Sequence, residues 1–180
     1  EIGRDSTQLF DNIDYLGEQR QVIVECFNNK LIKTSKESIV SVFEQQVDVR
    51  GDKTAVIFED SILTYRELDE RANQVARSLK KYGVKKGDLV VLLSQRGTEM
   101  VIGILGILKV GAAYVSIDFA YPKERIQYMI SDCKPVCILS NNIEFSSEIP
   151  IIEINSLEVV QESIERLNID IFEDDLAYII

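Results

Sequence analysis

The stretch GILGILKVGAAYVSID, residues 103 to 118, decides the fold of this chain. Residues 99 to 110 have the length and apolar content of a buried helix, and residues 112 to 117 have the pattern of a strand. Gly111 lies between them, where a helix commonly ends on a left-handed residue. Gly103 and Gly106 fall on adjacent turns and allow another element to approach closely. The stretch therefore predicts a closely packed helix that leads into a core strand.

Two other interpretations of this stretch fail. A phosphate-binding loop of the form GxxxxGK[ST] has two glycines spaced like Gly106 and Gly111, but Ala112 and Ala113 stand where it needs lysine and a hydroxyl. That loop also runs from strand to helix, whereas here the helix comes first. A membrane span needs about 20 apolar residues, and Lys109 ends the apolar run that begins at Met100.

Strand and helix patterns alternate on both sides of this stretch. Strands are predicted within residues 54–65 (two, around a turn), 88–93, 136–140 and 149–154. Three helices are predicted from capping motifs: TSKE at 34–37, TYRE at 64–67 and NSLE at 155–158, the last with Val160, Ile164 and Leu167 on its apolar face. This alternation of apolar strands and helices predicts an α/β fold, a mostly parallel sheet flanked by helices.

The composition excludes several classes of function. Acidic residues outnumber basic ones by 30 to 20, and the resulting charge of −10 opposes binding to nucleic acid. The sequence has no histidine, so a Ser-His-Asp or Cys-His site cannot form within it. The three cysteines, Cys26, Cys133 and Cys137, lack zinc-ligand spacing and suit a reducing, cytoplasmic environment. We expect Cys137 to be a buried, unreactive thiol.

A few polar side chains are candidates for a binding site. Asp118 follows a predicted strand, where open α/β sheets place ligands, but the simpler interpretation is that it caps the turn before Pro122. Ser94 and Arg96 also follow a strand, and a solvated loop is the simpler interpretation there. The acidic residues 173–175 lack the spacing of a calcium loop. No metal site is predicted.

The two ends of the chain suggest a piece of a larger protein. Residue 1 is not methionine, and no signal-peptide pattern follows it. DDLAYII, residues 174–180, has the pattern of a strand that the end of the chain interrupts partway. We therefore expect the chain to be an excised segment.

Taken together, these segments resemble the adenylation domains of non-ribosomal peptide synthetases, within the adenylate-forming, acyl-CoA synthetase-like superfamily. LTYREL at 63–68 is similar to the first core motif of that family, and LKVGAAYVSID at 108–118 is similar to the second. YPKERIQYMISD at 121–132 continues the resemblance. Ser116 and Phe119 stand where proline is usual, which concerns the local loop shape.

The resemblance implies the organisation and the chemistry. It implies a linker from a condensation domain over residues 1–33, and the first part of the adenylation domain over residues 34–180, before the phosphate-binding loop. The parent protein would use ATP and Mg²⁺ to activate an amino acid and load it on the phosphopantetheine of a carrier domain. The principal catalytic, cofactor-binding and metal-binding residues of the family do not map onto residues 1–180, so we predict none here and expect the segment alone to be inactive.

Two alternatives stay open. One is a segment of a stand-alone D-alanine–carrier ligase or of an acyl-CoA synthetase. The other is an interaction module without catalysis, which self-associates through an apolar surface that is exposed where the rest of the core belongs.

Overall fold

The computed structural model describes residues 36–141 and 145–180. The chain divides into two units, Glu1–Ser35 and Lys36–Ile180, and the fold below is that of the second. The linker predicted over residues 1–33 lies outside the described residues.

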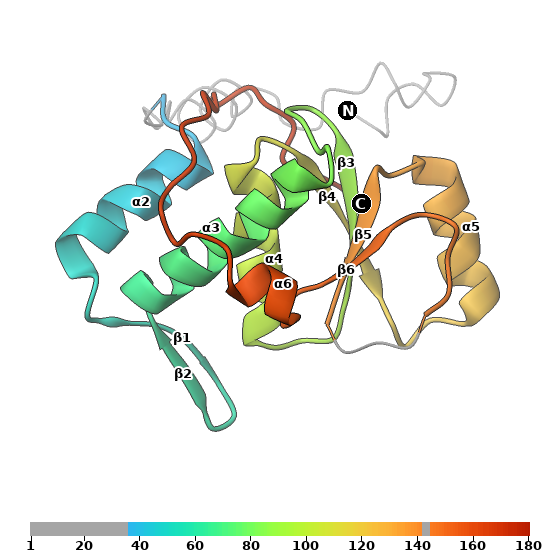
Figure 1. The fold of residues 1–180 in the computed structure, drawn as a ribbon, viewed down its shortest axis with the longest axis horizontal. Coiled ribbons are helices and arrows are strands. Elements are labelled where there is room, and N and C mark those ends of the chain that lie inside the picture. Colours follow the sequence, from blue (N-terminus) through green and yellow to red (C-terminus); the bar gives the residue numbers. More distant parts are fainter. Residues whose placement is uncertain (1–35, 142–144) are drawn as a thin grey trace, which may run out of the picture. The chain divides into compact units, whose positions relative to one another are not determined.

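A five-stranded sheet forms the centre of this unit (Figure 1). Its strands lie in the order β6-β5-β3-β4-β7, and every neighbouring pair is parallel. The strands are β3 (Leu89–Ser94), β4 (Ala113–Asp118), β5 (Cys137–Ser140), β6 (Ile151–Glu153) and β7 (Tyr178–Ile179). The central strand β3 is apolar along most of its length and buried from Val90 to Ser94, as expected for a parallel strand covered on both faces.

Helices cover both faces of the sheet (Figure 1). On one face lie α3 (Tyr65–Lys81) and α4 (Thr98–Lys109), whose apolar side chains contact Val90 and Leu92 of β3. On the other face lies α5 (Lys123–Cys133), which contacts Val91 and Leu93. The alternation of side chains along a strand explains this division. The predicted α/β fold with a parallel sheet flanked by helices is confirmed.

The opening stretch has the predicted structure. A Cβ atom on Gly106 would lie 2.5 Å from Cγ1 of Val75 and 3.2 Å from the carbonyl oxygen of Ala72, both on α3. A Cβ atom on Gly103 would lie 2.8 Å from Leu92 of β3. Gly111 follows the end of α4 with φ +80°, the left-handed conformation that glycine tolerates. The glycines therefore seat α4 against both α3 and the sheet.

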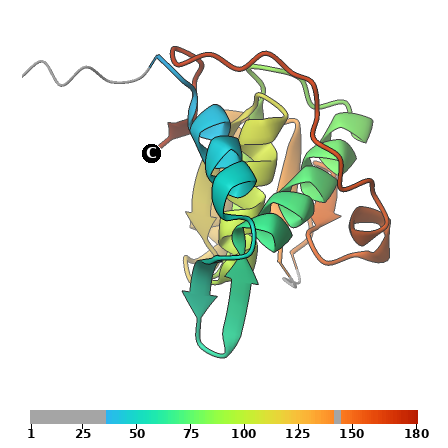
Figure 2. The same ribbon diagram turned by 90° about the vertical axis from the view of Figure 1, so that its left-hand side faces the viewer.

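An antiparallel hairpin precedes α3 and projects from the layered body (Figure 2). It consists of β1 (Thr54–Phe58) and β2 (Ser61–Thr64). The predicted capping box follows it: the Thr64 hydroxyl accepts from the Glu67 amide at 3.2 Å, and the Glu67 carboxylate accepts from the Thr64 amide at 2.8 Å. Gly83, with φ +87°, lies just beyond the end of α3.

The cap predicted for the first helix is wrong. Helix α2 (Ile39–Arg50) begins at Ile39, and Ser38 caps it by accepting from the Ser41 amide at 3.1 Å. Thr34 lies outside the described residues, four positions before the actual cap. Both Ser38 and Thr34 are good capping residues, and the burial of Val40 and Val47 against the core selects the later start.

The last predicted helix is much shorter than expected. Helix α6 (Leu157–Val160) begins within the predicted motif NSLE, but its cap is Ser156 rather than the first residue of that motif, and it ends at Val160. Ile164 and Leu167 lie in an irregular segment, residues 161–177, which crosses from α6 to β7 and which we call the strap. Side chains of α3 bind the carbonyl groups that a longer helix would use: Gln74 donates to Val160 and Glu162, Asn73 to Ile164, and Arg77 to Glu165 and Arg166. Contacts from a distant helix thus replace the local hydrogen bonds.

Candidate functional site

The connections that follow β3 and β4 run to opposite faces of the sheet, which makes these two strands a topological switch point. The chain leaves β3 toward α4 on one face, and it leaves β4 toward α5 on the other. In an open α/β sheet, ligands bind outside the carboxyl ends of two such strands. Ser94 and Asp118, the last residues of these strands, are partners in the register of the β3–β4 pair. The two polar residues singled out in the sequence therefore meet at the position that the topology favours for a ligand.

The side chains of Ser94 and Asp118 form hydrogen bonds with backbone groups close to them in sequence. Asp118 accepts from the Ala120 amide at 2.9 Å through Oδ1, which confirms the prediction that it caps the turn before Pro122. Ser94 is buried, and its hydroxyl donates to the Gln95 carbonyl at 2.7 Å. Arg96 is exposed in the loop that follows, as the simpler interpretation proposed. These contacts shape the loops that follow β3 and β4.

The first turn of α4 faces the same edge of the sheet. Its N-cap is Gly97, whose backbone is extended and which has no side chain to accept a hydrogen bond from the first amides of the helix. Thr98 is buried and donates to Glu99 at 3.0 Å.

Ser116, which departs from the usual proline, lies exposed within β4 and keeps its register with Leu92.

Residues 36–141 and 145–180 contain no group of three acidic or thiol side chains arranged to hold a metal ion. None of the helices within these ranges is long and apolar enough to cross a membrane. Within the acidic residues 173–175, Asp175 binds other groups of the protein. Asp175 accepts from the Phe172 amide at 2.7 Å and pairs with Lys86 at 2.7 Å. These two contacts, with Lys86 the larger cause, hold the pKa of Asp175 below its usual value.

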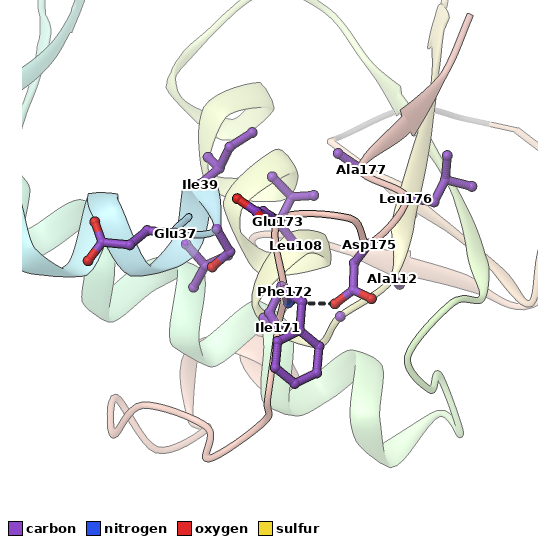
Figure 3. A pocket seen from close by; sticks show the side chains of 13 residues that line it. Glu37, Ile39, Leu108, Ala112, Ile171, Phe172, Glu173, Asp175, Leu176 and Ala177 are labelled. Carbon is purple, nitrogen blue, oxygen red and sulfur yellow. Dashed lines mark hydrogen bonds between the residues drawn. The ribbon is translucent and has the colours of Figure 1, made fainter. Parts of the chain in front are cut away.

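A small pocket of about 100 Å³ lies beside this acidic segment (Figure 3). Its walls come from the start of α2, the end of α4 and the strap, and they include Ile39, Leu108, Ala112, Phe172 and Leu176. Ala112 immediately precedes β4, and Leu176 closely precedes β7. The pocket therefore lies at the amino ends of the strands, at the opposite edge of the sheet from Ser94 and Asp118. Its position and apolar walls are those of a packing groove between elements.

A buried network of charges joins the helices on one face, and no local pattern in the sequence indicated it. The Lys109 side chain is only 2% exposed, pairs with Asp69 of α3 at 2.8 Å, and also pairs with Glu44 of α2. Arg166 of the strap pairs with Asp69 at 3.3 Å and with Asp48 at 2.8 Å. The hydrogen bonds from Arg166 lower the pKa of Asp48. Because its members come from four separate segments, only the fold reveals this network.

Comparisons with known proteins agree with this architecture. The family model described as AMP-binding enzyme matches residues 43–178. Tyrocidine synthase 3 of Brevibacillus parabrevis is 43% identical over 142 residues, which cover 75% of this chain and 2% of the synthase. Bacitracin synthase 3 of Bacillus licheniformis is 35% identical over 189 residues, covering 100% of this chain and 3% of the synthase. The chain thus spans a few per cent of the length of these relatives.

Solved structures show the same fold. The nonribosomal peptide synthetase FmoA3, in its AMPPNP-bound form, matches with a TM-score of 0.81 at 24% identity, over 88% of this chain and 18% of that chain. The four-domain nonribosomal peptide synthetase AB3403, bound to AMP and glycine, matches with a TM-score of 0.62 at 33% identity, over 66% of this chain and 9% of that chain. With the family match across most of its length, the chain belongs to the AMP-binding enzyme family, and it corresponds to part of an adenylation domain of the nonribosomal peptide synthetase type.

Proposed function

We propose that this chain is the front part of an amino-acid-activating domain within a larger synthetase. The observation that carries the proposal is the family match over residues 43–178, joined to relatives that are peptide synthetases. The parent protein would convert an amino acid and ATP into an aminoacyl adenylate. It would then transfer the aminoacyl group to the phosphopantetheine thiol of a carrier domain.

The proposed reaction has two balanced steps. A carboxylate oxygen of the amino acid attacks the α-phosphorus of ATP, and pyrophosphate leaves. The carrier thiol then attacks the acyl carbon of the adenylate and loses its proton, and AMP leaves. Both steps need groups that stabilise negative charge on phosphate oxygens, together with Mg²⁺. The described residues do not form a metal-binding cluster, so we assign no step of this chemistry to a residue of this chain.

The chain would instead supply the framework of the site. Strand β7 is parallel to β4 and lies beside it, so its carboxyl end lies at the same edge of the sheet as Asp118. We propose that the segment after Ile180 in the parent begins at this edge and contains the phosphate-binding loop. On this proposal the 180 residues alone are inactive, with no catalytic, cofactor-binding or metal-binding residue of their own.

The remaining assignments follow from membership in the family. We propose that residues 1–33 connect to a condensation domain, and that a carrier domain and the amino acid are the other partners. The charge of −10 supports the proposal that nucleic acid is not a partner. Free Cys133 and Cys137 support a reducing cytoplasm as the place of action.

Amino-acid-dependent exchange of labelled pyrophosphate into ATP by the parent protein tests the function. We expect exchange with one or a few amino acids from a panel, and none with fatty acids. Exchange with fatty acids alone would instead identify an acyl-CoA synthetase, and exchange with D-alanine alone would identify a D-alanine–carrier ligase. Either of those results, or the absence of exchange with every acid, contradicts the proposal.

A specific surface supports the second alternative, self-association of the isolated chain. Strand β7 lies at an edge of the sheet, and Leu176, Tyr178 and Ile180 are exposed along or beside it. An exposed, unpaired apolar strand edge favours pairing with another copy. We propose that the isolated chain forms dimers through β7. Size-exclusion chromatography with light scattering tests this, because a mass that stays at 20.5 kDa as the concentration rises contradicts it.

A further inference from the structure

Lys86 lies in the turn between α3 and β3, and its ammonium group makes three contacts with one short part of the strap. It donates to the Asp170 carbonyl at 2.8 Å. It pairs with the Asp175 carboxylate at 2.7 Å. It also lies 4.3 Å from the centre of the Phe172 ring. We call these contacts of Lys86 with residues 170–175 the Lys86 clamp. Neighbouring Lys85 is exposed and provides a natural comparison.

The residues gripped by the clamp also hold one another. Asp175 accepts from the Phe172 amide at 2.7 Å, a hydrogen bond visible in Figure 3. The Asp175 amide donates to the Phe172 carbonyl at 3.2 Å. The clamp thus closes on a turn that is already formed. Because one charged group contacts a carbonyl, a carboxylate and a ring together, it fixes the turn in both position and orientation.

Gly111 of the opening stretch makes room for the clamp. A Cβ atom on Gly111 would lie 3.2 Å from both Cβ and Cγ of Lys86. The Gly111 carbonyl also accepts from the Gly87 amide at 2.9 Å, which fixes the turn that carries Lys86 against the end of α4. The stem of Lys86 therefore lies across a glycine, and its ammonium group reaches the strap beyond.

Two residues separate the turn that Lys86 contacts from β7, the shortest strand of the sheet. Strand β7 has two residues and, among the described strands, pairs with β4 alone, in the register Tyr114 with Tyr178 and Val115 with Ile179. The Tyr114 amide donates to the Ala177 carbonyl at 3.0 Å, and the rings of Tyr114 and Tyr178 stack with centres 5.7 Å apart. So short a pairing needs its approach fixed from outside, because two residues contribute little on their own.

We propose that Lys86 is a positioning residue: by holding residues 170–175 it seats β7 on β4 and thereby places the segment that follows Ile180 at the carboxyl edge of the sheet. The second half of this statement rests on the proposed function, since it concerns the phosphate-binding segment of the parent. The first half concerns this chain alone and is tested separately.

Amide hydrogen exchange in the 180-residue chain tests the seating of β7. The reporter is the Tyr114 amide, which bonds to Ala177 on the β7 side. The internal control is the adjacent Ala113 amide, which donates to Asp88 on the β3 side at 2.9 Å. In Lys86→Met we expect the Tyr114 amide to exchange at least ~10-fold faster. Local detachment of an edge strand exposes only the amides that are hydrogen-bonded to that side. Ala113 should be unchanged.

Matched variants separate this effect from general destabilisation. Lys85→Met should leave both amides unchanged, and Lys86→Arg should retain most of the Tyr114 protection because it keeps the charge. Asp175→Asn removes one contact of the clamp and should give an intermediate rate. If Tyr114 stays protected in Lys86→Met, or if Ala113 and Tyr114 accelerate together in both Lys86→Met and Asp175→Asn, the proposal is overturned.

Kinetics in the parent protein test the consequence for ATP. In pyrophosphate exchange, Lys86→Met should raise KM for ATP at least ~5-fold. The apparent affinity for ATP falls when the phosphate-binding segment adopts its binding-competent position only part of the time. KM for the amino acid should stay near its original value, and Lys86→Arg should restore KM for ATP. An unchanged KM for ATP overturns the positioning role. A parent without any exchange contradicts the proposed function instead, and the hydrogen-exchange result then stands by itself.

Discussion

At the scale of single residues, the two glycines of α4 differ in what surrounds them. A Cβ atom added to Gly106 would lie 2.7 Å from the Cβ atom of Val75 and would also contact the backbone of α3. Next to Gly103 lie the ends of flexible side chains, Leu92, Leu139 and Ile154. Side-chain ends can rotate away, whereas a backbone can yield only if α3 and α4 separate. The same substitution should therefore have different consequences at the two positions.

We predict that Gly106→Ala lowers the free energy of unfolding by about 1–3 kcal/mol, the usual range for overpacking a core. The gain in helix propensity, about 1 kcal/mol, offsets only part of this. Gly103→Ala, with the same propensity gain, should cost less. Urea unfolding followed by circular dichroism checks both, and an equal or larger loss for Gly103→Ala would contradict the close approach of α3 and α4.

Cys137 provides a residue-scale test of the core. The side chain is fully buried in β5, and desolvation raises the pKa of its thiol to about 12. Because the thiolate is the reactive form, only about 10⁻⁴ of it is ionised at pH 8. We predict that iodoacetamide labels the half-buried Cys133 well before Cys137 in the folded chain. Peptide mass spectrometry resolves the sites, and the two should react at similar rates in concentrated urea. Fast labelling of Cys137 in the folded chain would show that the core is open.

At the scale of elements, the charges around Lys109 join α2, α3, α4 and the strap. Removing one partner from a buried ion network leaves other charges without compensation, which costs about 3–5 kcal/mol. Arg166 also pairs with Asp69 and partly compensates it. We therefore predict that Lys109→Met lowers the free energy of unfolding by about 3 kcal/mol, the lower end of that range.

Denaturant unfolding of Lys109→Met, compared with that of Lys85→Met, checks this prediction. The control removes an exposed charge and should change the free energy of unfolding little. A wild-type free energy of unfolding for Lys109→Met would mean that the network contributes nothing net to holding the helices together.

The elements also show which parts of the fold the sequence could predict. The strands around Val91 and Val115 and the end of α4 at Gly111 follow from local patterns, and they were predicted correctly. The first part of the strap, as far as Leu167, was predicted as helix because Ile164 and Leu167 keep helical spacing with Val160. Its carbonyl groups instead bind Asn73 and other α3 side chains about ninety positions earlier. No window of neighbouring residues contains that information.

The candidate site shows the same limit. Asp118 was identified because it follows a strand, and the turn it caps was predicted from Pro122 nearby. Its register partnership with Ser94 on the adjacent strand depends on the strand order, which the sequence did not specify. The buried role of Lys109 was missed for the same reason, since Glu44 and Asp69 lie far away in the chain. Local chemistry was predictable, and the grouping of distant side chains was not.

At the scale of the whole molecule, residues 36–180 form a layered α/β unit whose carboxyl edge gathers the loops after β3 and β4 and the end of β7. Our central proposal is that this unit is a framework, and that the groups that bind ATP and perform the chemistry lie elsewhere in the parent protein. The framework should fold without performing the reaction. Folding and activity are therefore separable measurements on the same 180 residues.

Amino-acid-dependent exchange of labelled pyrophosphate into ATP, measured on the purified 180-residue chain beside the parent protein, tests this most directly. Cooperative urea unfolding of the chain would first establish that it is folded. We predict exchange above the blank for the parent and none for the chain with any amino acid. Exchange by the chain alone that depends on the amino acid and rises in proportion to chain concentration would contradict the proposal, because it would place the catalytic groups within these residues.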